Sequence, residues 1–392
     1  MSCSLTVKQL FPPSHAAKIC PNHCFIFPDA PPAPCPAQRT VRIPLLVLHD
    51  QRRLSHPHFS AHPQLDLTTY CNATCYWQGD GELDVNLPTE RLAFETLYSD
   101  GSRTLTTVGV KGEKKHGDTS PPTQLSARRK RAARHRRRRR QIYGEDGRFS
   151  IPGDHFLLEY PFSTAVLIST GCSGVLVSSR HVLTAAHCVH NGKDYVKGSQ
   201  KLRVGFLSPP DRNSTRPGQS SPARPLVHWV RVRRLRVPKG WIQSPPEIRM
   251  DFDYTLLELR RPHRRPFMRL SVAPSFEDLA GKRIHFSGFD SDRPGELVYR
   301  FCPVEDESNE LIYQHCDARP GASGSGVYGR VWDSALERWD RKVFGVFSGH
   351  QWLEVDGQNY DFNVAVRLTP LKIAQICYWL HGSHVSCNQD LE

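Results

Sequence analysis

The chain has 392 residues, of which 38% are hydrophobic, enough for one large domain with an extension or for two domains. Its formal net charge is +13, but the run "RRKRAARHRRRRR" from Arg128 to Arg140 contains ten of the basic residues, and without them +3 remains. This balance excludes nucleic-acid binding as a property of the whole chain, and no apolar run approaches the length that spans a membrane.

The first part of the chain is expected to be poorly ordered. Residues 1–60 are rich in Pro, His and Cys without sustained periodicity, so we predict an irregular segment. The first twenty residues contain no apolar core of signal-peptide length. Because the remainder has the features of a secreted protein, we expect this segment to come from an alternative or mis-assigned first exon.

Residues 61–140 are interpreted as a propeptide-like extension. They contain a helical-looking segment, "PTERLAFETLYSDG", and a strand-like one, "RTLTTVGV", before the arginine run closes the extension at Arg140. This is small for an independent domain.

Residues 141–392 are predicted to form one all-β domain. The stretch "TAVLISTGCSGVLVSSRHVLTAAHCV" has two apolar, β-branched runs around a Gly-Cys-Ser-Gly turn and indicates a hairpin. Many short strands follow, separated by Gly, Pro and Asp, as in a barrel or sandwich. Finally, "TPLKIAQICYWLHG" has helical spacing and a glycine stop at Gly382, which predicts a closing C-terminal α-helix.

Twelve cysteines and two sequons, at Asn72 and Asn213, are consistent with a secreted, disulfide-bonded glycoprotein. Two near pairs are candidate disulfides: Cys302 with Cys316, and Cys377 with Cys387. The C-x-x-x-C spacings at Cys20 and Cys24 and at Cys71 and Cys75 are weak zinc signals, because no matching quartet follows. We therefore predict no metal and no cofactor.

Three short motifs carry candidate catalytic residues. In "LTAAHC", His187 ends an apolar stretch, and a Cys172–Cys188 disulfide would give its loop the rigidity that a general base needs. In "MDFDYTLLEL", Asp253 directly precedes an apolar strand and is the candidate to orient the histidine, with Asp251 as the second choice.

The third motif, "GASGSG", contains the candidate nucleophile. Glycines on both sides of Ser323 permit a tight turn that exposes its hydroxyl. The amides of Gly321 and Ser323 could then form an oxyanion hole. A lone motif of this kind is usually a simple turn, so the prediction depends on all three motifs occurring together.

The order His, Asp, Ser in these motifs resembles the trypsin-like serine peptidases. Longer stretches such as "RIHFSGFDSDRPGELVYRFC" and "CDARPGASGSGVY" resemble a secreted vertebrate subgroup of them, from about residue 60 onward. The resemblance implies a chymotrypsin-like double β-barrel, made as a zymogen, that hydrolyses protein or peptide substrates. One relative is thought to have lost its nucleophile, so a catalytically silent binding protein is the alternative.

Ala322 departs from the family pattern. Trypsin-like enzymes carry an aspartate here that binds a newly freed N-terminal ammonium and so orders the oxyanion loop. Cleavage after Arg140 would expose Gln141, not an isoleucine. We therefore hypothesise that other contacts order this loop.

The arginine run has several interpretations. It fits a proprotein-convertase site between Arg140 and Gln141, a heparin-binding patch, a nuclear localisation signal or a solvated linker. Processing is favoured, since the run lies where a propeptide should end. The alternating strand "WVRVRRLRV" adds an arginine-rich face, either solvated or an exosite for heparan sulfate.

Substrate-binding residues are predicted from spacing relative to Ser323. By resemblance, Asp317 would lie at the base of the primary specificity pocket and select Arg or Lys, unless the nearby Arg319 pairs with it. In "FSGHQW", Ser348 and Gly349 would offer backbone contacts to an extended substrate, and His350 would line the pocket wall.

Overall fold

The structure, a computed structural model, describes residues 43–63, 70–71, 92–111, 142–151, 155–208, 226–274, 283–333, 338–355 and 358–382. They belong to one compact unit, Arg42–Glu392. The arginine run, the Arg140–Gln141 bond and the sequons at Asn72 and Asn213 lie outside the described residues.

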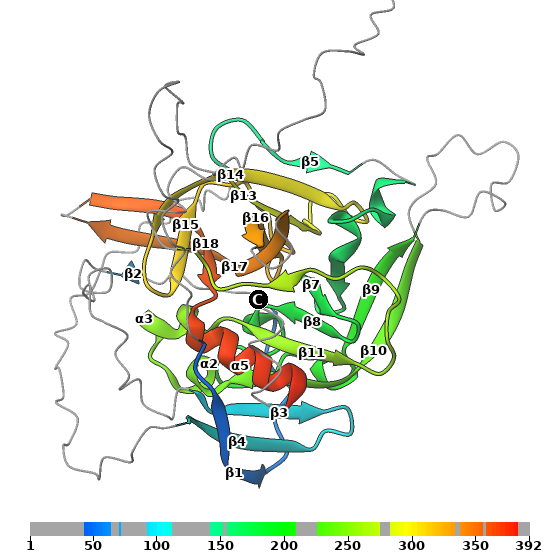
Figure 1. Cartoon of the computed structure of the whole chain (residues 1–392), viewed down its shortest axis with the longest axis vertical. Coiled ribbons are helices and arrows are strands. Elements are labelled where there is room, and N and C mark those ends of the chain that lie inside the picture. Colours follow the sequence, from blue (N-terminus) through cyan, green and yellow to red (C-terminus); the bar gives the residue numbers. More distant parts are fainter. Residues whose placement is uncertain are drawn as a thin grey trace, which may run out of the picture. The chain divides into compact units, whose positions relative to one another are not determined.

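The first half of the β domain is a closed antiparallel barrel, shown mainly in green in Figure 1. Its strand order is β10-β11-β8-β7-β6-β9, and pairing of β9 with β10 closes the ring. Its strands are β6 (Ala165–Ile168), β7 (Cys172–Ser178), β8 (His181–Thr184), β9 (Arg203–Ser208), β10 (Leu226–Pro238) and β11 (Thr255–Leu259).

The second half is another closed antiparallel barrel, with the order β17-β16-β13-β14-β15-β18 and closure between β17 and β18. Its strands are β13 (Arg283–Gly288), β14 (Val298–Glu307), β15 (Leu311–Gln314), β16 (Gly326–Asp333), β17 (Arg338–Val355) and β18 (Gln358–Arg367). The short strands β2 (Tyr70–Cys71) and β12 (Arg269–Leu270) pair with β17, and β5 (Phe149–Ser150) pairs with β14. The predicted all-β double barrel is confirmed.

The helix α5, Pro370–His381, ends the described chain and confirms the predicted C-terminal helix. The Thr369 side chain accepts a hydrogen bond from the Lys372 amide at the N-terminus, and Gly382 ends the helix with φ of 63°. Figure 1 shows α5 in red beside β11. The Tyr254 hydroxyl next to β11 donates to Gln375 Oε1 at 2.7 Å, which fixes the helix on the first barrel.

The predicted hairpin differs in detail. The Gly-Cys-Ser-Gly motif is not its turn, because Cys172 begins β7 and the chain reverses at Gly171, whose φ is +96°. The stretch holds three strands, β6, β7 and β8, each paired with the next.

Part of the N-terminal extension is folded onto the first barrel. β1 (Leu46–Leu54), β3 (Phe94–Tyr98) and β4 (Arg103–Val110) continue the first sheet, and β3 pairs with β10. The prediction of a helix in "PTERLAFETLYSDG" is therefore wrong, since Phe94–Tyr98 is a strand. Phe94 packs edge-on against Trp379 of α5 with ring centroids 5.5 Å apart, so tertiary contacts outweigh the helical spacing.

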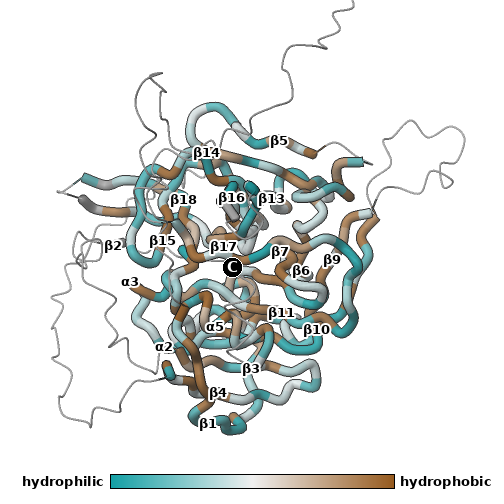
Figure 2. The backbone as a smooth tube through the Cα atoms, in the orientation of Figure 1, coloured by the Kyte–Doolittle hydropathy of each residue, from teal (hydrophilic) through white to brown (hydrophobic). Residues whose placement is uncertain are grey.

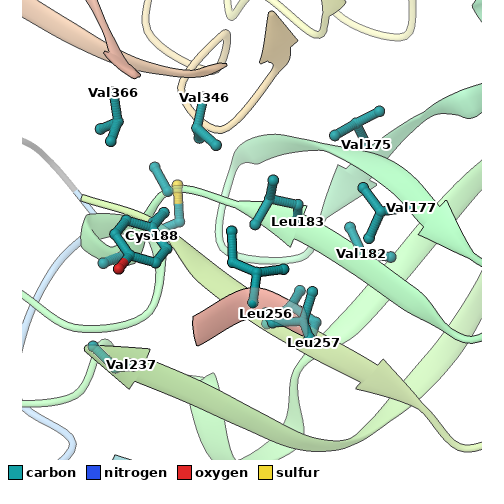
Figure 3. Close-up of a cluster of buried hydrophobic side chains, with 14 of the residues drawn as sticks. Val175, Val177, Val182, Leu183, Cys188, Val237, Leu256, Leu257, Val346 and Val366 are labelled. Carbon is teal, nitrogen blue, oxygen red and sulfur yellow. The ribbon is translucent and has the colours of Figure 1, made fainter. Parts of the chain in front are cut away.

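The hydrophobic core fills the first barrel and continues toward the second. In Figure 2, many strands and the helix α5 carry hydrophobic segments, whereas stretches of other strands, such as β10 and β13, are hydrophilic. Figure 3 shows valine and leucine side chains of β7, β8 and β11 meeting Val346 and Val366 from the second barrel. β-Branched residues suit this packing because they fit the pleated, buried surface of a sheet. Among the described residues no helix is both long and apolar enough to cross a membrane.

Candidate active site

His187 is presented by the first barrel just after β8. It lies in a short 3-10 helix, Ala186–Cys188, and its side chain is 3% exposed. The predicted disulfide between Cys172 and Cys188 is present and joins this helix to the start of β7. The covalent tie fixes the loop that carries the imidazole.

Asp253 comes from the neighbouring strand of the same barrel. The chain passes from β10 through α2 (Lys239–Gln243), α3 (Pro246–Arg249) and a 3-10 helix, Met250–Phe252. Asp253 follows directly, two residues before β11, which pairs with β8. Asp251, the second choice, lies half-buried in the 3-10 helix.

The two side chains make a two-point contact. Asp253 is fully buried and accepts from the His187 amide at 2.8 Å through Oδ1, while its Oδ2 lies 2.7 Å from His187 Nδ1. A carboxylate at this distance holds the ring proton on Nδ1 and leaves Nε2 as the basic nitrogen. The carboxylate that reaches His187 is thus that of Asp253.

Ser348 links the acid to the candidate nucleophile. Its hydroxyl donates to Asp253 Oδ2 at 2.5 Å, and its carbonyl accepts from Ser323 Oγ at 3.1 Å. Ser323 itself is half-buried, in the turn between β15 and β16. Sequence reasoning gave Ser348 only a backbone role and missed its side-chain contact.

The turn around Ser323 is held open by backbone contacts. Gly321 has φ of +102°, and a Cβ there would lie 2.2 Å from the Phe289 carbonyl oxygen, so only glycine fits. The Ser323 carbonyl accepts from the Ser173 amide at 2.8 Å. Within the described part of the chain, no acceptor is recorded for the Gly321 or Ser323 amide. Two free amides in one turn are what an oxyanion hole requires.

The sulfur atoms beside His187 offer no metal site. Cys172, His187 and Cys188 bring their ligand atoms within 4.8 Å of one another. The two sulfurs, however, are joined in the disulfide and have no thiolate to offer.

Asp317 is buried and fully engaged, which was not expected. Its Oδ1 accepts from the Tyr143 amide at 2.6 Å and its Oδ2 from the Gly147 amide at 2.7 Å. Arg319, which the sequence offered as a partner of Asp317, instead has its Nε 3.8 Å from Asp292 Oδ2. Each oxygen of the Asp317 carboxylate thus accepts one backbone amide, and its role in selecting a basic substrate side chain stays a prediction.

His350 lies in β17, two residues after Ser348, and is buried. Its Nε2 contacts Asp361 Oδ1, and its ring packs edge-on against Trp352 with centroids 5.5 Å apart. The Tyr143 hydroxyl also donates to Asp361, at 3.3 Å; burial and this carboxylate raise the pKa of Tyr143. Gly349 pairs with Val364 of β18.

Of the other cysteine pairs, Cys302 and Cys316 form a disulfide, as predicted, and brace the chain that leads to the Ser323 turn. Cys377 is buried in α5, but Cys387 lies outside the described residues, so that pair stays a prediction.

Comparison with known proteins agrees with this architecture. A family described as "Trypsin-like peptidase domain" matches residues 172–332. Serine protease 23 of Rattus norvegicus is 50% identical over 364 residues, which cover 90% of this chain and 92% of that protein. The chain belongs to the trypsin-like serine protease family. The fold and the order of the motifs are those that the sequence predicted for this family.

Relatives within the family differ in their described activity. Serine protease 23 of Homo sapiens is 49% identical over 359 residues, covering 90% of this chain and 92% of that protein. "Inactive serine protease 35" of Rattus norvegicus is 44% identical over 383 residues, which cover 88% of this chain and 92% of that protein. A solved structure of a Glu endopeptidase in complex with MPD is 19% identical, with a TM-score of 0.44, and covers 61% of this chain and 98% of that chain.

Proposed function

We propose that this trypsin-like serine protease is an active endopeptidase that hydrolyses peptide bonds through an acyl-enzyme intermediate. In this proposal Ser323 attacks the scissile carbonyl, His187 takes its proton, and Asp253 orients and stabilises the imidazolium. The amides of Gly321 and Ser323 hold the oxyanion. The backbone of Ser348 and Gly349 pairs with an extended substrate as an added strand.

The observation that carries this proposal is the contact of His187 with Asp253, 2.7 Å from Nδ1 to Oδ2 in a buried setting. Burial keeps water from competing for that contact, and the contact prepares Nε2 as a base. In the structure the Ser323 hydroxyl donates to the Ser348 carbonyl. For attack this hydroxyl has to turn toward His187.

A fluorophosphonate probe tests the proposal, because it reacts only with an activated serine. Secreted protein should be labelled, and Ser323→Ala should abolish labelling. Ser60→Ala is the matched control, since Ser60 is exposed and its hydroxyl donates to Asp194 at 2.6 Å. If the wild-type protein folds normally but is not labelled, the alternative is favoured: a binding protein without catalytic activity. One relative is described as inactive.

We also propose that the protein is extracellular and that a proprotein convertase cleaves it after Arg140. The basic run and the family membership support this. N-terminal sequencing of secreted material tests it. A start at Gln141, in the open or the cyclised form, is expected. Secreted material that consists of intact chains alone would contradict it.

Association with heparan sulfate is the remaining part of the proposal. On β10, Arg231 and Arg233 are exposed, and Arg231 borders a surface hollow of about 450 Å³ together with Arg260 and Arg261. Arg234 is half-buried and paired with Glu258, and the exposed Arg233 also donates to Glu258 at 3.4 Å, so only part of the predicted arginine face is free for sulfates. Heparin retention should fall with salt and on deletion of residues 128–140.

A further inference from the structure

A segment that follows the predicted cleavage point lies against the second barrel. Residues 142–151 include "IYGEDGRFSI" and end in β5, which pairs with β14. The Tyr143 and Gly147 amides bind Asp317, six residues before Ser323. The segment is therefore anchored beside the chain that forms the nucleophile turn.

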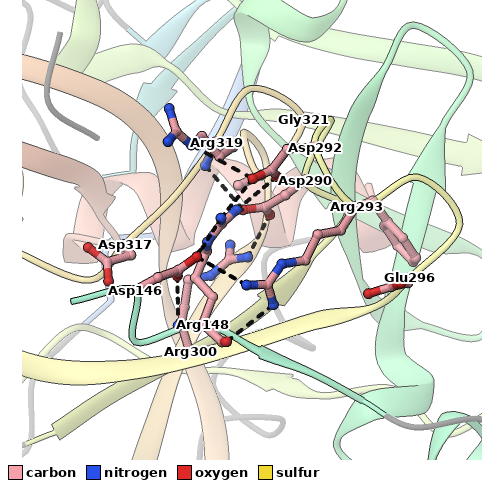
Figure 4. A network of polar contacts seen from close by, with 12 residues as sticks. Asp146, Arg148, Asp290, Asp292, Arg293, Glu296, Arg300, Asp317, Arg319 and Gly321 are labelled. Carbon is pink, nitrogen blue, oxygen red and sulfur yellow. Dashed lines mark hydrogen bonds and ion pairs between the residues drawn. The ribbon is translucent and has the colours of Figure 1, made fainter. Parts of the chain in front are cut away.

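Arg148 is the centre of this contact, as Figure 4 shows. Its side chain is 3% exposed, although it carries a positive charge. Its guanidinium donates to Asp290 at 2.8 Å, to Asp292 at 2.7 and 2.9 Å, and to Asp146 at 2.8 and 2.9 Å. Every direction of the planar fork is used, which a lysine ammonium could not reproduce.

Asp290 carries this contact to the nucleophile turn. It is fully buried, and its Oδ1 accepts from Arg300 at 2.5 Å. Its Oδ2 accepts from the Arg319 amide at 3.1 Å as well as from Arg148. Next to it, the Ser291 amide donates to the Pro320 carbonyl at 2.7 Å.

These bonds align residues 289–291 with residues 319–321. The Phe289 carbonyl lies against Gly321, and the Arg319 carbonyl accepts from the Ala322 amide at 3.1 Å. The Ala322 side chain is fully buried, where the family's aspartate would stand. The backbone that determines the direction of the oxyanion amides is thus fixed from Asp290.

We propose that Arg148 is a positioning residue: it fixes Asp290, which holds residues 319–321 so that the oxyanion amides face the substrate. The inference rests on the proposed function. A side-chain cation built into the chain at position 148 takes the place of a freed N-terminal ammonium. Order in the turn is then independent of which residue begins the processed chain.

The charge that holds the turn does not titrate in the accessible pH range. An α-amino group loses its charge with a pKa of about 8, whereas the carboxylates around Arg148 raise the pKa of its guanidinium further. The charged groups that face Arg148 come from its own segment, from the 290–293 loop, from β14 and from the turn: Asp146, Asp290, Asp292, Arg293, Arg300 and Arg319. Arg148 lowers the pKa of Asp146 and Asp292, so these groups stay charged at neutral and alkaline pH.

Fluorophosphonate labelling of Arg148→Ala and Arg148→Lys tests the proposal. Both variants should react roughly 100-fold more slowly or worse, as when an oxyanion donor is lost. Millimolar ethylguanidine should restore labelling of Arg148→Ala but not of Arg148→Lys. Arg293→Gln is the matched control. The Arg293 side chain binds the same segment through Asp146, the Arg148 carbonyl and Ser150. Its contact with Asp290 is through the backbone, from the Arg293 amide to the Asp290 carbonyl at 3.1 Å, and the substitution keeps it.

A second measurement does not need activity. Hydrogen exchange of the Arg319–Ser323 amides should be faster in Arg148→Ala than in Arg293→Gln, with the other strands of the second barrel unchanged. Wild-type protein cleaved so that its protease domain begins at Ala133 or at Gln141, with the N-terminal fragment retained, should be labelled at equal rates, and these rates should not decline between pH 8.5 and 10.

The outcomes separate the two proposals. Unlabelled wild-type protein overturns the proposed function, and hydrogen exchange still decides the role of Arg148. Equal labelling and equal exchange in Arg148→Ala and Arg293→Gln would overturn that role. An activity that needs one particular N-terminus, or that falls as an α-amine loses its proton, would do the same.

Discussion

At the scale of single residues, Ser348 connects the parts of the candidate active site. It binds Asp253 with its hydroxyl and Ser323 with its carbonyl. Asp253 Oδ2 receives both this hydroxyl and the contact of His187 Nδ1. A buried carboxylate needs such donors, because burial without them disfavours its charged form.

Replacement of Ser348 by alanine should therefore slow acylation. A hydrogen bond to a charged group contributes about 1.5–3 kcal/mol, which corresponds to a roughly 10- to 100-fold lower labelling rate. The rate constants for fluorophosphonate labelling of wild-type protein and of Ser348→Ala measure this difference. Unchanged labelling in a normally folded variant would show that Asp253 is adequately held without this hydroxyl.

Gly321 is predicted to tolerate no side chain. In Gly321→Ala the new Cβ meets the Phe289 carbonyl, so the turn shifts and labelling should fall about 100-fold. Gly295→Ala is a matched control, because Gly295 also has positive φ, +84°, but has nothing within 4 Å of the added Cβ. It should lose about 1–2 kcal/mol of stability and retain labelling. Equal labelling of the two variants would contradict the prediction.

Local motifs indicated the candidate residues, but not their supports. His187, Asp253 and Ser323 each stand in a short motif that local sequence can show. Arg148 and Asp290 are 142 residues apart and have no motif, and only the fold brings them together. The backbone partners of Asp317 were missed for the same reason, because they come from a distant segment.

At the scale of elements, the N-terminal extension behaves as part of the first barrel. β3 pairs with β10 over five residues, Arg234 to Pro238. From α5, Gln375 Nε2 donates to the Leu92 carbonyl at 2.7 Å, and Trp379 packs on Phe94. From the sequence, residues 61–140 are interpreted as a propeptide-like extension. The partner of β3 lies far along the chain in β10, so local sequence does not show this pairing.

Cleavage after Arg140 should therefore leave the N-terminal fragment bound. The two fragments should elute together in native size-exclusion chromatography and separate in denaturant. Leu97→Asp should release the fragment, because Leu97 is 1% exposed in β3 and a charge there has no partner. Leu48→Asp, in β1 and 55% exposed, is the control that should not. Dissociation of the wild-type fragments would contradict this placement.

At the scale of the whole molecule, buried histidines link stability to pH. Burial lowers the pKa of His181 and of His190 to about 4. His190 accepts from the Gly192 amide at 3.0 Å and packs edge-on against Tyr195 with centroids 4.6 Å apart. In the unfolded chain the same histidines titrate near 6.5.

The sign follows from proton binding. Between pH 6.5 and 4 the unfolded chain binds protons at these histidines and the folded chain does not, so stability falls as the pH falls. Burial acts in the opposite direction at Glu307, raising its pKa to about 7, so protonation of this group stabilises the fold over part of the same range. The unfolding free energy therefore falls less steeply with falling pH than the two histidines alone would make it fall.

A single substitution isolates one histidine from this sum. In wild-type protein each buried histidine lowers the unfolding free energy by up to about 1.4 kcal/mol per pH unit below 6.5. His190→Gln should remove one such contribution, so its stability relative to wild type should rise from pH 7 to pH 5 by about 1–2 kcal/mol. Urea unfolding at the two pH values measures the difference, with His155→Gln as control because that side chain is 87% exposed. A pH-independent difference between His190→Gln and wild type would mean that His190 titrates alike in the folded and unfolded protein, and its burial against Tyr195 would not lower its pKa.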